Sequence, residues 1–273
     1  MNRADSCKPS DGDREHWNSF QRGFFLMRPP LRPDADVVAA FRELLRDHDD
    51  PMLLLGVTPE FADLSPNLTA IDRTQPMLDF VWPGDTPRRR ARVGNWLKLA
   101  LPSASFASVI SDGALTFPYP GLTTKVLREA ANVLIRGGRF VCRVYSSPEM
   151  GETLEAVRAA FMRGEVGSIH ALKWRVGMAL GHERGGPNVP VSEIRDTIER
   201  WFPDRAALSA DSGWPRDEID TIDSYAGSNA VYGFATRSQF LAIVPPEFTN
   251  ARFVEAGCYE LAERCPLLVM ERA

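Results

Sequence analysis

The chain has 273 residues, of which 44% are hydrophobic and 25% are charged, with a formal net charge of −4 and a pI of about 5.7. This balance is ordinary for a globular protein and excludes disordered and fibrous classes. Proteins that bind phosphate backbones are usually basic, so the acidic balance disfavours nucleic acid as a partner. The apolar runs are too short to span a bilayer and the N-terminus is polar, so we expect a cytoplasmic protein with no membrane contact.

Cysteine and histidine residues are spread thinly along the chain. No two cysteines form a C-x-x-C pair, and none stands at a metal-ligand spacing from a histidine. This pattern disfavours a metal site and a disulfide framework, and it favours a reducing compartment. The residues concerned are Cys7, Cys142, Cys258, Cys265, His16, His48, His170 and His182.

The N-terminal segment, residues 1–33, precedes the main pattern of strands and helices. Residues 15–27 carry aromatic side chains at near-helical spacing, which predicts a helix packed on the main domain. The alternative is a lid over a ligand, with His16, Trp17 or Asn18 at the mouth of the site. The sequence RPPLRP that follows predicts an extended connector, because each proline disfavours helix at the residue before it.

An apolar run from Met52 to Leu55 begins the stretch around which we expect the fold to be organised. A short continuous run of this kind is typical of a strand buried on both faces in a parallel sheet. Gly56 allows a sharp turn after the strand, and Thr58 before Pro59 is typical of a helix N-cap. We therefore predict a helix over residues 59–64.

A second short strand is predicted from Leu68 to Ile71, and Asp72 follows it. A glycine after one strand, a helix N-terminus beside it and an acid after the next strand are typical of a nucleotide half-site. Backbone N–H groups can face the polar tail of the ligand, and the carboxylate can accept from both ribose hydroxyls. The full dinucleotide fingerprint needs three glycines, of which only Gly56 is present. Met77 could pack against the base of the ligand.

Strand and helix patterns alternate through the rest of the first half of the chain. This alternation predicts βαβ units and a parallel sheet, with helices on both faces. The predicted helices cover residues 34–47 and 121–136, with a short helical turn ending near Pro83, and the predicted strands cover residues 90–94, 106–111 and 139–145.

Strand patterns stop between residues 148 and 235. A Gly/Pro-rich loop over residues 181–191 interrupts this part of the chain and is expected to be mobile. So many helical patterns between two strands predict an inserted helical lobe, which we expect to contact a substrate. The helical patterns lie at about 150–163, 167–181, 192–202 and 215–225.

The C-terminal part begins with a capping box at Thr236 and Gln239, which predicts a helix through Ile243. Two strands follow, at about 251–259 and 266–271, and they must pair antiparallel because the connection is too short for a crossover. We therefore predict an α/β fold with a seven-stranded, mostly parallel, doubly wound sheet, an antiparallel C-terminal hairpin strand and an inserted helical lobe. The predicted division is a lid or connector at 1–33, a Rossmann-like domain at 34–147 and 236–273, and a helical insertion at 148–235.

This order of elements resembles the class I (Rossmann-like) S-adenosylmethionine-dependent methyltransferases, and the resemblance covers about 33–147 and 236–273. In that family a β-hairpin completes five parallel strands. The matching residues are Gly56 after the first strand, Asp72 after the second, Asn95-Trp96 after the third, Asp112-Gly113 after the fourth, Gly137-Gly138 before the fifth, and the terminal LLVMER strand.

The resemblance implies S-adenosylmethionine as the cofactor. It implies that Asp72 holds the ribose hydroxyls, that Asn95 meets the adenine amine and that Trp96 lies near the ring. Arg73 and Met77, which follow Asp72, complete this side of the predicted site. The residues expected beside the methionine part are Gly56, Val57 and Thr58, and those expected on the floor near the sulfonium are Ser111, Asp112 and Gly113.

The first loop departs from the family pattern, which is acid-x-Gly-x-Gly-x-Gly. Leu54 stands at the acid, Thr58 at the second glycine and Glu60 at the third, and Asn95 stands where an aspartate is common. We expect the bulkier loop residues to reshape the methionine pocket.

The predicted function is methyl transfer to a small or medium-sized acceptor by in-line displacement, in which the protein mainly positions the acceptor. The Asn/Asp-Pro-Pro-aromatic turn of amide and base-amine methyltransferases is missing after the fourth strand, as is the Pro-Cys of cytosine-carbon enzymes. No catalytic residue is assigned and the oligomeric state stays open. Candidate bases, each as readily structural, are Asp112, His16, His170, Tyr119 and Tyr145.

Two alternatives stay open at this point. A methyltransferase-like scaffold could bind a partner or cofactor without catalysis, and the altered glycine loop favours that interpretation. A nicotinamide-dependent oxidoreductase is disfavoured, because the chain lacks both G-x-G-x-x-G and a Tyr-x-x-x-Lys pair, and because it carries the C-terminal hairpin.

Overall fold

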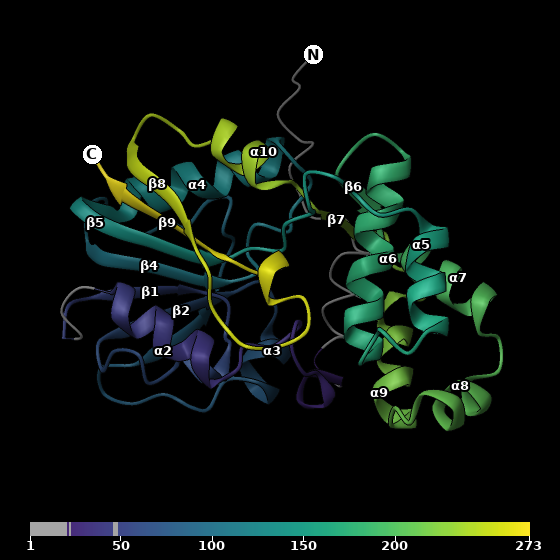
Figure 1. Cartoon of the computed structure of the whole chain (residues 1–273). Coiled ribbons are helices and arrows are strands. Elements are labelled where there is room, and N and C mark those ends of the chain that lie inside the picture. Colours follow the sequence, from purple (N-terminus) through teal and green to yellow (C-terminus); the bar gives the residue numbers. More distant parts are fainter. Residues whose placement is uncertain (1–20, 22, 46–48) are drawn as a thin grey trace, which may run out of the picture.

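The structure, a computed structural model, describes residues 21, 23–45 and 49–273. A seven-stranded sheet with the order β3-β2-β1-β4-β5-β9-β8 forms its centre (Figure 1). Neighbouring strands from β3 to β5 pair parallel, whereas β9 runs antiparallel to both of its neighbours. This confirms the predicted fold class. The strands are β1 Met52–Leu55, β2 Leu68–Asp72, β3 Arg90–Val93, β4 Phe106–Asp112, β5 Leu134–Arg143, β8 Phe248–Val254 and β9 Leu267–Arg272.

Helices cover both faces of the sheet, because alternate residues of a central strand point to opposite sides. In β1, Leu53 and Leu55 pack into one apolar layer, and Met52 and Leu54 pack into the other. The first layer lies under α4 and α10, and the second lies against α2 and α3 (Figure 1). These helices are α2 Ala35–Leu44, α3 Gln75–Phe80, α4 Gly121–Val133 and α10 Arg237–Ala242.

Two predicted caps are present. The carboxylate of Asp34 accepts from the N–H of Val37 at 2.8 Å, at the start of α2. Thr236 and Gln239 form the predicted capping box of α10. Thr58 differs, because its side chain makes no cap hydrogen bond, and only a 3₁₀ turn over Pro59–Phe61 follows it. The helix predicted over 59–64 is therefore wrong; Pro66 disfavours helix at Ser65, so the segment is too short for more than one turn.

The boundary between α4 and β5 also differs from the prediction. The apolar pattern extends the expected helix to residue 136, but Leu134 is already extended and pairs with Phe106 of β4. The two glycines that were expected to end the helix lie inside β5, and Gly137 has a φ of +69°. Pairing across the sheet overrides the local helical pattern here.

Between β5 and α10 the chain forms a helical part that lies beside the carboxyl ends of the central strands (Figure 1). It has its own apolar core, in which Trp174 contacts Tyr145, Tyr232 and Phe234. Its helices are α5 Leu154–Met162, α6 Ile169–Glu183, α7 Val191–Trp201, α8 Arg205–Ser212 and α9 Arg216–Asp220, followed by a 3₁₀ turn over Thr221–Tyr225.

The prediction that strand patterns stop in this part is wrong. Strands β6 Asn188–Pro190 and β7 Val231–Gly233 pair antiparallel, and β6 replaces part of the loop expected over 181–191. Each has three residues, which is too few to show an alternating pattern. Helix α8 was not predicted. The helix expected over 15–27 lies largely outside the described residues, as do His16, Trp17 and Asn18; within it the structure shows a 3₁₀ turn over Phe24–Leu26.

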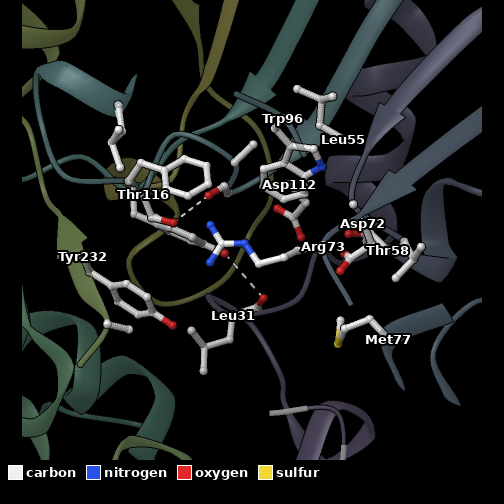
Figure 2. Close-up of a pocket in the computed structure, with 18 of the residues that line it drawn as sticks. Leu31, Leu55, Thr58, Asp72, Arg73, Met77, Trp96, Asp112, Thr116 and Tyr232 are labelled. Carbon is white, nitrogen blue, oxygen red and sulfur yellow. Dashed lines mark hydrogen bonds between the residues drawn. The ribbon is translucent and has the colours of Figure 1, made fainter. Parts of the chain in front are cut away.

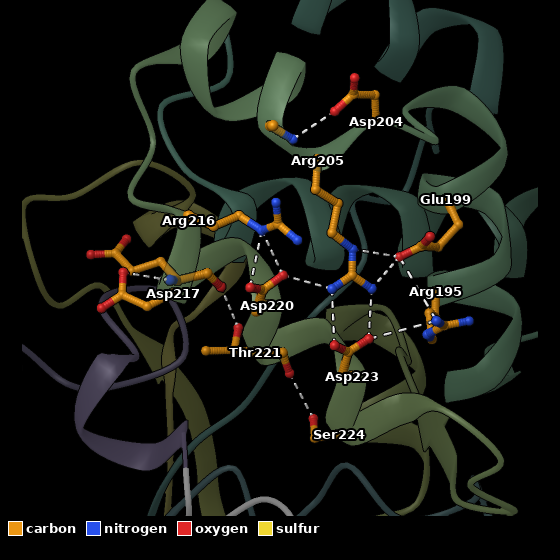
Figure 3. Close-up of polar contacts among 12 residues, drawn as sticks. Arg195, Glu199, Asp204, Arg205, Arg216, Asp217, Asp220, Thr221, Asp223 and Ser224 are labelled. Carbon is orange, nitrogen blue, oxygen red and sulfur yellow. Dashed lines mark hydrogen bonds and ion pairs between the residues drawn. The ribbon is translucent and has the colours of Figure 1, made fainter.

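Arg205, at the start of α8, joins the helices of this part (Figure 3). Its guanidinium donates to Glu199 of α7, to Asp220 of α9 at 2.7 Å, and to both oxygens of Asp223 at 2.6 and 2.9 Å. The Arg205 side chain is 13% exposed. These bonds, with the carboxylate of Asp223 contributing most, raise the pKa of Arg205 above its ordinary value.

We expect Arg205→Met to lower the free energy of unfolding by about 1–2 kcal/mol, because three carboxylates lose their shared partner and repel one another. Urea unfolding followed by circular dichroism measures this loss, which added salt should reduce. The matched control is Arg216→Met. Arg216 is 51% exposed and pairs with Asp220, so its loss should stay below about 0.5 kcal/mol. Equal losses in the two variants would contradict the role of Arg205.

Candidate functional site

The turn after β1 places backbone at the carboxyl edge of the sheet. Gly56 has a φ of +116°, a conformation that side chains other than hydrogen rarely adopt. Its N–H donates to the carbonyl of Ile71 in β2 at 2.8 Å, which draws the two strand ends together. The residues after it, Val57 and Thr58, then pass along the wall of a cavity.

Asp72 ends β2 at the same edge. The residue is 7% exposed, and its carboxylate accepts a long hydrogen bond from the N–H of Thr74 at 3.3 Å. Burial raises the pKa of this carboxyl from 3.8 to about 6, against the opposing effects of the Thr74 and Arg73 backbone and of the Arg73 charge. A buried carboxylate that is this weakly compensated would be stabilised by further hydrogen-bond donors from a ligand.

The turn after β3 supplies Trp96, whose indole N–H donates to the carbonyl of Ile71 at 2.6 Å. Its ring lies edge-on to Phe117, with centroids 5.8 Å apart. The guanidinium of Arg73 lies over that same Phe117 ring, 5.6 Å from its centroid. Asn95 accepts from the N–H of Leu97 at 2.9 Å, so its amide group is oriented by the turn. These side chains enclose a small hollow beside Asp72.

The last residues of β4 and β5, Asp112 and Arg143, form a buried ion pair. The guanidinium of Arg143 donates through Nε and Nη2 to the two oxygens of Asp112, with Nη2 to Oδ2 at 3.0 Å, and it also donates to the hydroxyls of Tyr259 at 2.9 Å and Tyr145 at 3.2 Å. The side chains of Arg143 and Asp112 are 0% and 6% exposed. Burial lowers the pKa of Arg143, but the Asp112 carboxylate raises it well above the ordinary value. Asp112 faces the cavity and Arg143 lies behind it.

One cavity of about 230 Å³ connects these strand ends with the helical part. Most of the predicted cofactor residues line it; Asn95 lines the adjoining hollow instead. Ser111 lines neither, because its buried hydroxyl donates to the carbonyl of Leu55 at 2.7 Å. The predicted residues that line the cavity are Gly56, Val57, Thr58, Asp72, Arg73, Met77, Trp96, Asp112 and Gly113.

On the other side of the cavity a lid at 1–33 and a substrate-contacting helical lobe were expected and Tyr145 was a candidate base, but the other lining residues were not predicted. This side belongs to the N-terminal segment, the loop after β4 and the helical part, which are far apart in the sequence. Composition and periodicity give no signal for it, since apolar residues at these positions read as core. The additional lining residues are Phe24, Leu31, Leu55, Ala114, Thr116, Phe117, Pro118, Leu122, Tyr145, Trp174, Asn229, Ala230, Val231 and Tyr232.

The candidate bases differ in position. His170 is buried in the helical part, where its Nε2 lies 3.2 Å from the carbonyl of Leu26, and burial lowers its pKa to about 3. Tyr119 donates to the carbonyl of Gln239 at 3.0 Å. Neither lines the cavity, whereas Asp112 and Tyr145 do. His16 lies outside the described residues.

The donor set fits an adenosine cofactor better than a metal. Asp72 offers a buried carboxylate to a ribose, and Trp96 with Phe117 offers ring surface to a base. Within the described ranges, no three His, Cys, Asp or Glu side chains gather closely enough to hold a metal ion. The same residues include no helix with the length and hydropathy needed to cross a bilayer.

Comparison with known proteins gives one family match, to a methyltransferase domain over residues 56–142. No protein of curated function matches significantly. Similar solved structures include a candidate Zn-dependent alcohol dehydrogenase from Rhodobacter sphaeroides, with 12% identity, 97% of this chain and 100% of that chain covered, and a TM-score of 0.60. The PH0226 protein from Pyrococcus horikoshii OT3 is 12% identical to this chain, with a TM-score of 0.52. That alignment covers 92% of this chain and 98% of the PH0226 chain. At such identities these likenesses show a shared fold alone.

The family match begins at the glycine that turns the chain out of β1 and ends within β5. It therefore covers the strands whose carboxyl ends form one side of the cavity. In open α/β sheets, ligands bind outside those strand ends. By this similarity residues 56–142 are a methyltransferase domain, and S-adenosylmethionine is the cofactor that the family match supports.

Proposed function

We propose that the chain transfers a methyl group to a small or medium-sized acceptor bound between the sheet edge and the helical part. The observation that carries this proposal is the shared cavity, which Asp72 lines from β2 and Trp174 and Tyr232 line from α6 and β7. Its volume of about 230 Å³ is small for a ligand pocket, which typically measures roughly 300–1,000 Å³. An acceptor that shares this cavity with a cofactor is therefore limited to a small molecule.

The cofactor roles proposed for the sheet edge follow from position. Asp72 would accept from the ribose hydroxyls, and Gly56 with Thr58 would border the methionine part. Trp96 would contact the adenine ring, and Asn95 in the adjoining hollow would meet its amine. When bound, S-adenosylmethionine supplies a methyl group attached to a good sulfur leaving group, and a lone pair of the acceptor displaces that sulfur in line.

The contribution of the protein is positioning and exclusion of water. Asp112 presents a carboxylate to the cavity, and the bidentate contact with Arg143 fixes its plane. Tyr145 is held between two partners, since its hydroxyl accepts from Arg143 and donates to the carbonyl of Leu31 at 3.4 Å. These fixed groups can orient an acceptor without moving during the reaction.

The predicted division of the chain enters here as part of the proposal. Phe24 and Leu31 line the cavity, which supports a lid or connector role for residues 1–33. Arg28 forms an ion pair with Glu218 of α9, so this segment also contacts the helical part. We propose the helical insertion at 148–235 as a substrate lobe closing on the Rossmann-like domain.

Binding of S-adenosylhomocysteine should depend on pH through Asp72. Ribose hydroxyls donate to the carboxylate form, so affinity should rise by up to tenfold per pH unit below about pH 6 and level off above about pH 7.

The contribution of Asp72 to the free energy of unfolding should fall as the pH rises. Since the folded pKa lies above 3.8, the folded state binds more protons between about pH 4 and 6, and this stabilising contribution is lost as the pH rises through 6.

Titration calorimetry from pH 5 to 8 measures this dependence, and Asp72→Asn is the control. The variant keeps the shape of the side chain but cannot ionise, so its affinity should be lower and independent of pH in this range. An identical pH profile in both proteins would assign the titration to another group.

The function itself is tested by calorimetric titration with S-adenosylmethionine and S-adenosylhomocysteine, with NAD and NADP as controls. Micromolar binding of the sulfur compounds alone, followed by mass-shift detection of methylated acceptors, would support the proposal. Tight binding without transfer to any acceptor would favour the non-catalytic scaffold. Binding of NAD or NADP alone would favour an oxidoreductase.

A further inference from the structure

The cofactor roles proposed above involve no residue on the side of the cavity opposite Asp72. Figure 2 shows Tyr232 and Leu31 across the cavity from Asp72 and Thr58. We call this side the aromatic end. It comprises Phe24, Leu31, Tyr145, Trp174, Ala230 and Tyr232.

The aromatic end is built around the indole ring of Trp174, which is 2% exposed. The ring of Tyr145 lies edge-on to it, with centroids 4.9 Å apart and an interplanar angle of 78°. The ring of Tyr232 also lies edge-on to the indole, with centroids 5.7 Å apart and an interplanar angle of 82°. Rings held in this way are rigid, and they offer a preformed apolar surface to a planar ligand.

The six residues of the aromatic end carry no acidic or basic group, and the Arg73 guanidinium, which extends across the cavity (Figure 2), lies over the ring of Phe117. Of the described residues that line the cavity, Asp72, Arg73 and Asp112 carry acidic or basic groups, and Asp112 is paired with Arg143. Burial raises the pKa of both Tyr145 and Tyr232 above the ordinary value, so their hydroxyls stay neutral. A charged ligand group at the aromatic end would lose its hydration without gaining a counter-charge, which is unfavourable.

The aromatic end is apolar but not without polar groups. The hydroxyl of Tyr232 is directed into the cavity (Figure 2), and it also hydrogen-bonds with the side chain of Tyr225. The indole N–H of Trp174 is buried and has no hydrogen-bond partner among the described residues. An unpaired buried donor is unfavourable, and a ligand oxygen that reached it would remove this cost.

We propose that the aromatic end holds the methyl acceptor, and that this acceptor is an uncharged ring compound carrying a polar group such as a hydroxyl. The inference rests on the proposed function, in which the cofactor occupies the opposite side. It narrows the acceptor from any small molecule to a neutral aromatic one.

The test is calorimetric titration of the full chain, saturated with S-adenosylhomocysteine at pH 7, with phenol and 2-naphthol. Benzoate and tetramethylammonium are the charged comparison probes. We expect both ring alcohols to bind at least tenfold more tightly than either charged probe. Tighter or equal binding of benzoate or tetramethylammonium would overturn the proposal, the latter by showing an aromatic cage for cations.

Ala230→Leu locates the bound ring. Ala230 is 5% exposed and lines the aromatic end, so the larger side chain should fill the space and weaken 2-naphthol binding by tenfold or more. The matched control is Ala226→Leu, the same change at an exposed position in the same loop, which should alter the affinity by less than twofold. Equal affinity in the two variants would place the ring elsewhere and overturn the proposal.

Tyr232→Phe provides a second variant that keeps the ring and removes only the hydroxyl. The variant should weaken phenol binding several-fold and leave toluene binding unchanged. Equal effects on the two affinities would contradict a polar contact between the ligand and Tyr232. If S-adenosylhomocysteine does not bind, the cofactor assignment fails by itself. Titration of the ring probes into the cofactor-free protein, with Ala230→Leu and Ala226→Leu, then still tests whether the aromatic end binds a neutral ring.

Discussion

Asp72→Ala should weaken the binding of S-adenosylhomocysteine by about 10- to 150-fold while the protein stays folded. The variant removes a buried carboxylate that would accept from both ribose hydroxyls, and charge-assisted contacts of this kind contribute roughly 1.5–3 kcal/mol. In the fold itself this carboxylate accepts a hydrogen bond from Thr74 at 3.3 Å, which is long and weak. Its removal should therefore change the thermal midpoint little.

Titration calorimetry gives the affinity, and near-UV circular dichroism shows whether packing is intact. Asp79→Ala is the matched control, since Asp79 is exposed on α3 a short distance along the chain. The control should bind as the natural protein does. If Asp72→Ala also bound with unchanged affinity, the ribose would lie elsewhere and the assignment of the sheet edge would be wrong.

Asp112→Asn should lower the free energy of unfolding by about 3–5 kcal/mol, because it leaves a buried guanidinium without its counter-charge. The Arg143 side chain is 0% exposed, and arginine does not lose its proton at ordinary pH. Most buried charged groups avoid this cost by becoming neutral, but the Arg143 guanidinium stays charged. A loss of this size corresponds to a thermal midpoint roughly 6–20 °C lower.

Urea unfolding measures the change, and a double variant separates its cause. Asp112→Asn combined with Arg143→Met removes both charges, so it should be less destabilising than Asp112→Asn alone. Asp63→Asn is the exposed control, because Asp63 pairs with Arg89 but is 90% exposed; it should cost less than about 1 kcal/mol. A double variant less stable than the single one would show that packing, not charge, stabilises this region.

The side of the cavity at the sheet edge could be predicted because it depends on local order alone. The carboxyl ends of parallel strands meet at one edge whatever the side chains are, so residues after β1, β2 and β4 had to lie together. Gly56 follows β1 directly, Asp72 is the last residue of β2, and both line the same cavity. Ser111 is the exception; β4 continues to Asp112, so Ser111 faces the sheet interior and donates to Leu55.

The side of the cavity that the helical part forms could not be predicted residue by residue, since apart from Tyr145, a candidate base, its residues look like ordinary core. Trp174 lies on a helix that is buried over most of its length, and its periodicity gives no sign of a cavity. Strand β7 carries Tyr232 and pairs with β6, far back in the sequence, over three residues each. Such short pairings are set by the helices around them and not by local propensity.

By itself the sequence determined the sheet, its helices and the edge at which the cofactor is expected, because apolar periodicity, caps and turn residues act over a few neighbouring residues. Only the tertiary structure decided what meets that edge. Burial of Arg143 forces a bidentate pair with Asp112, and packing of the N-terminal segment and the helical part brings Leu31 and Tyr232 to the same cavity. These contacts join segments far apart in the chain, and their energies depend on burial, which no local pattern encodes.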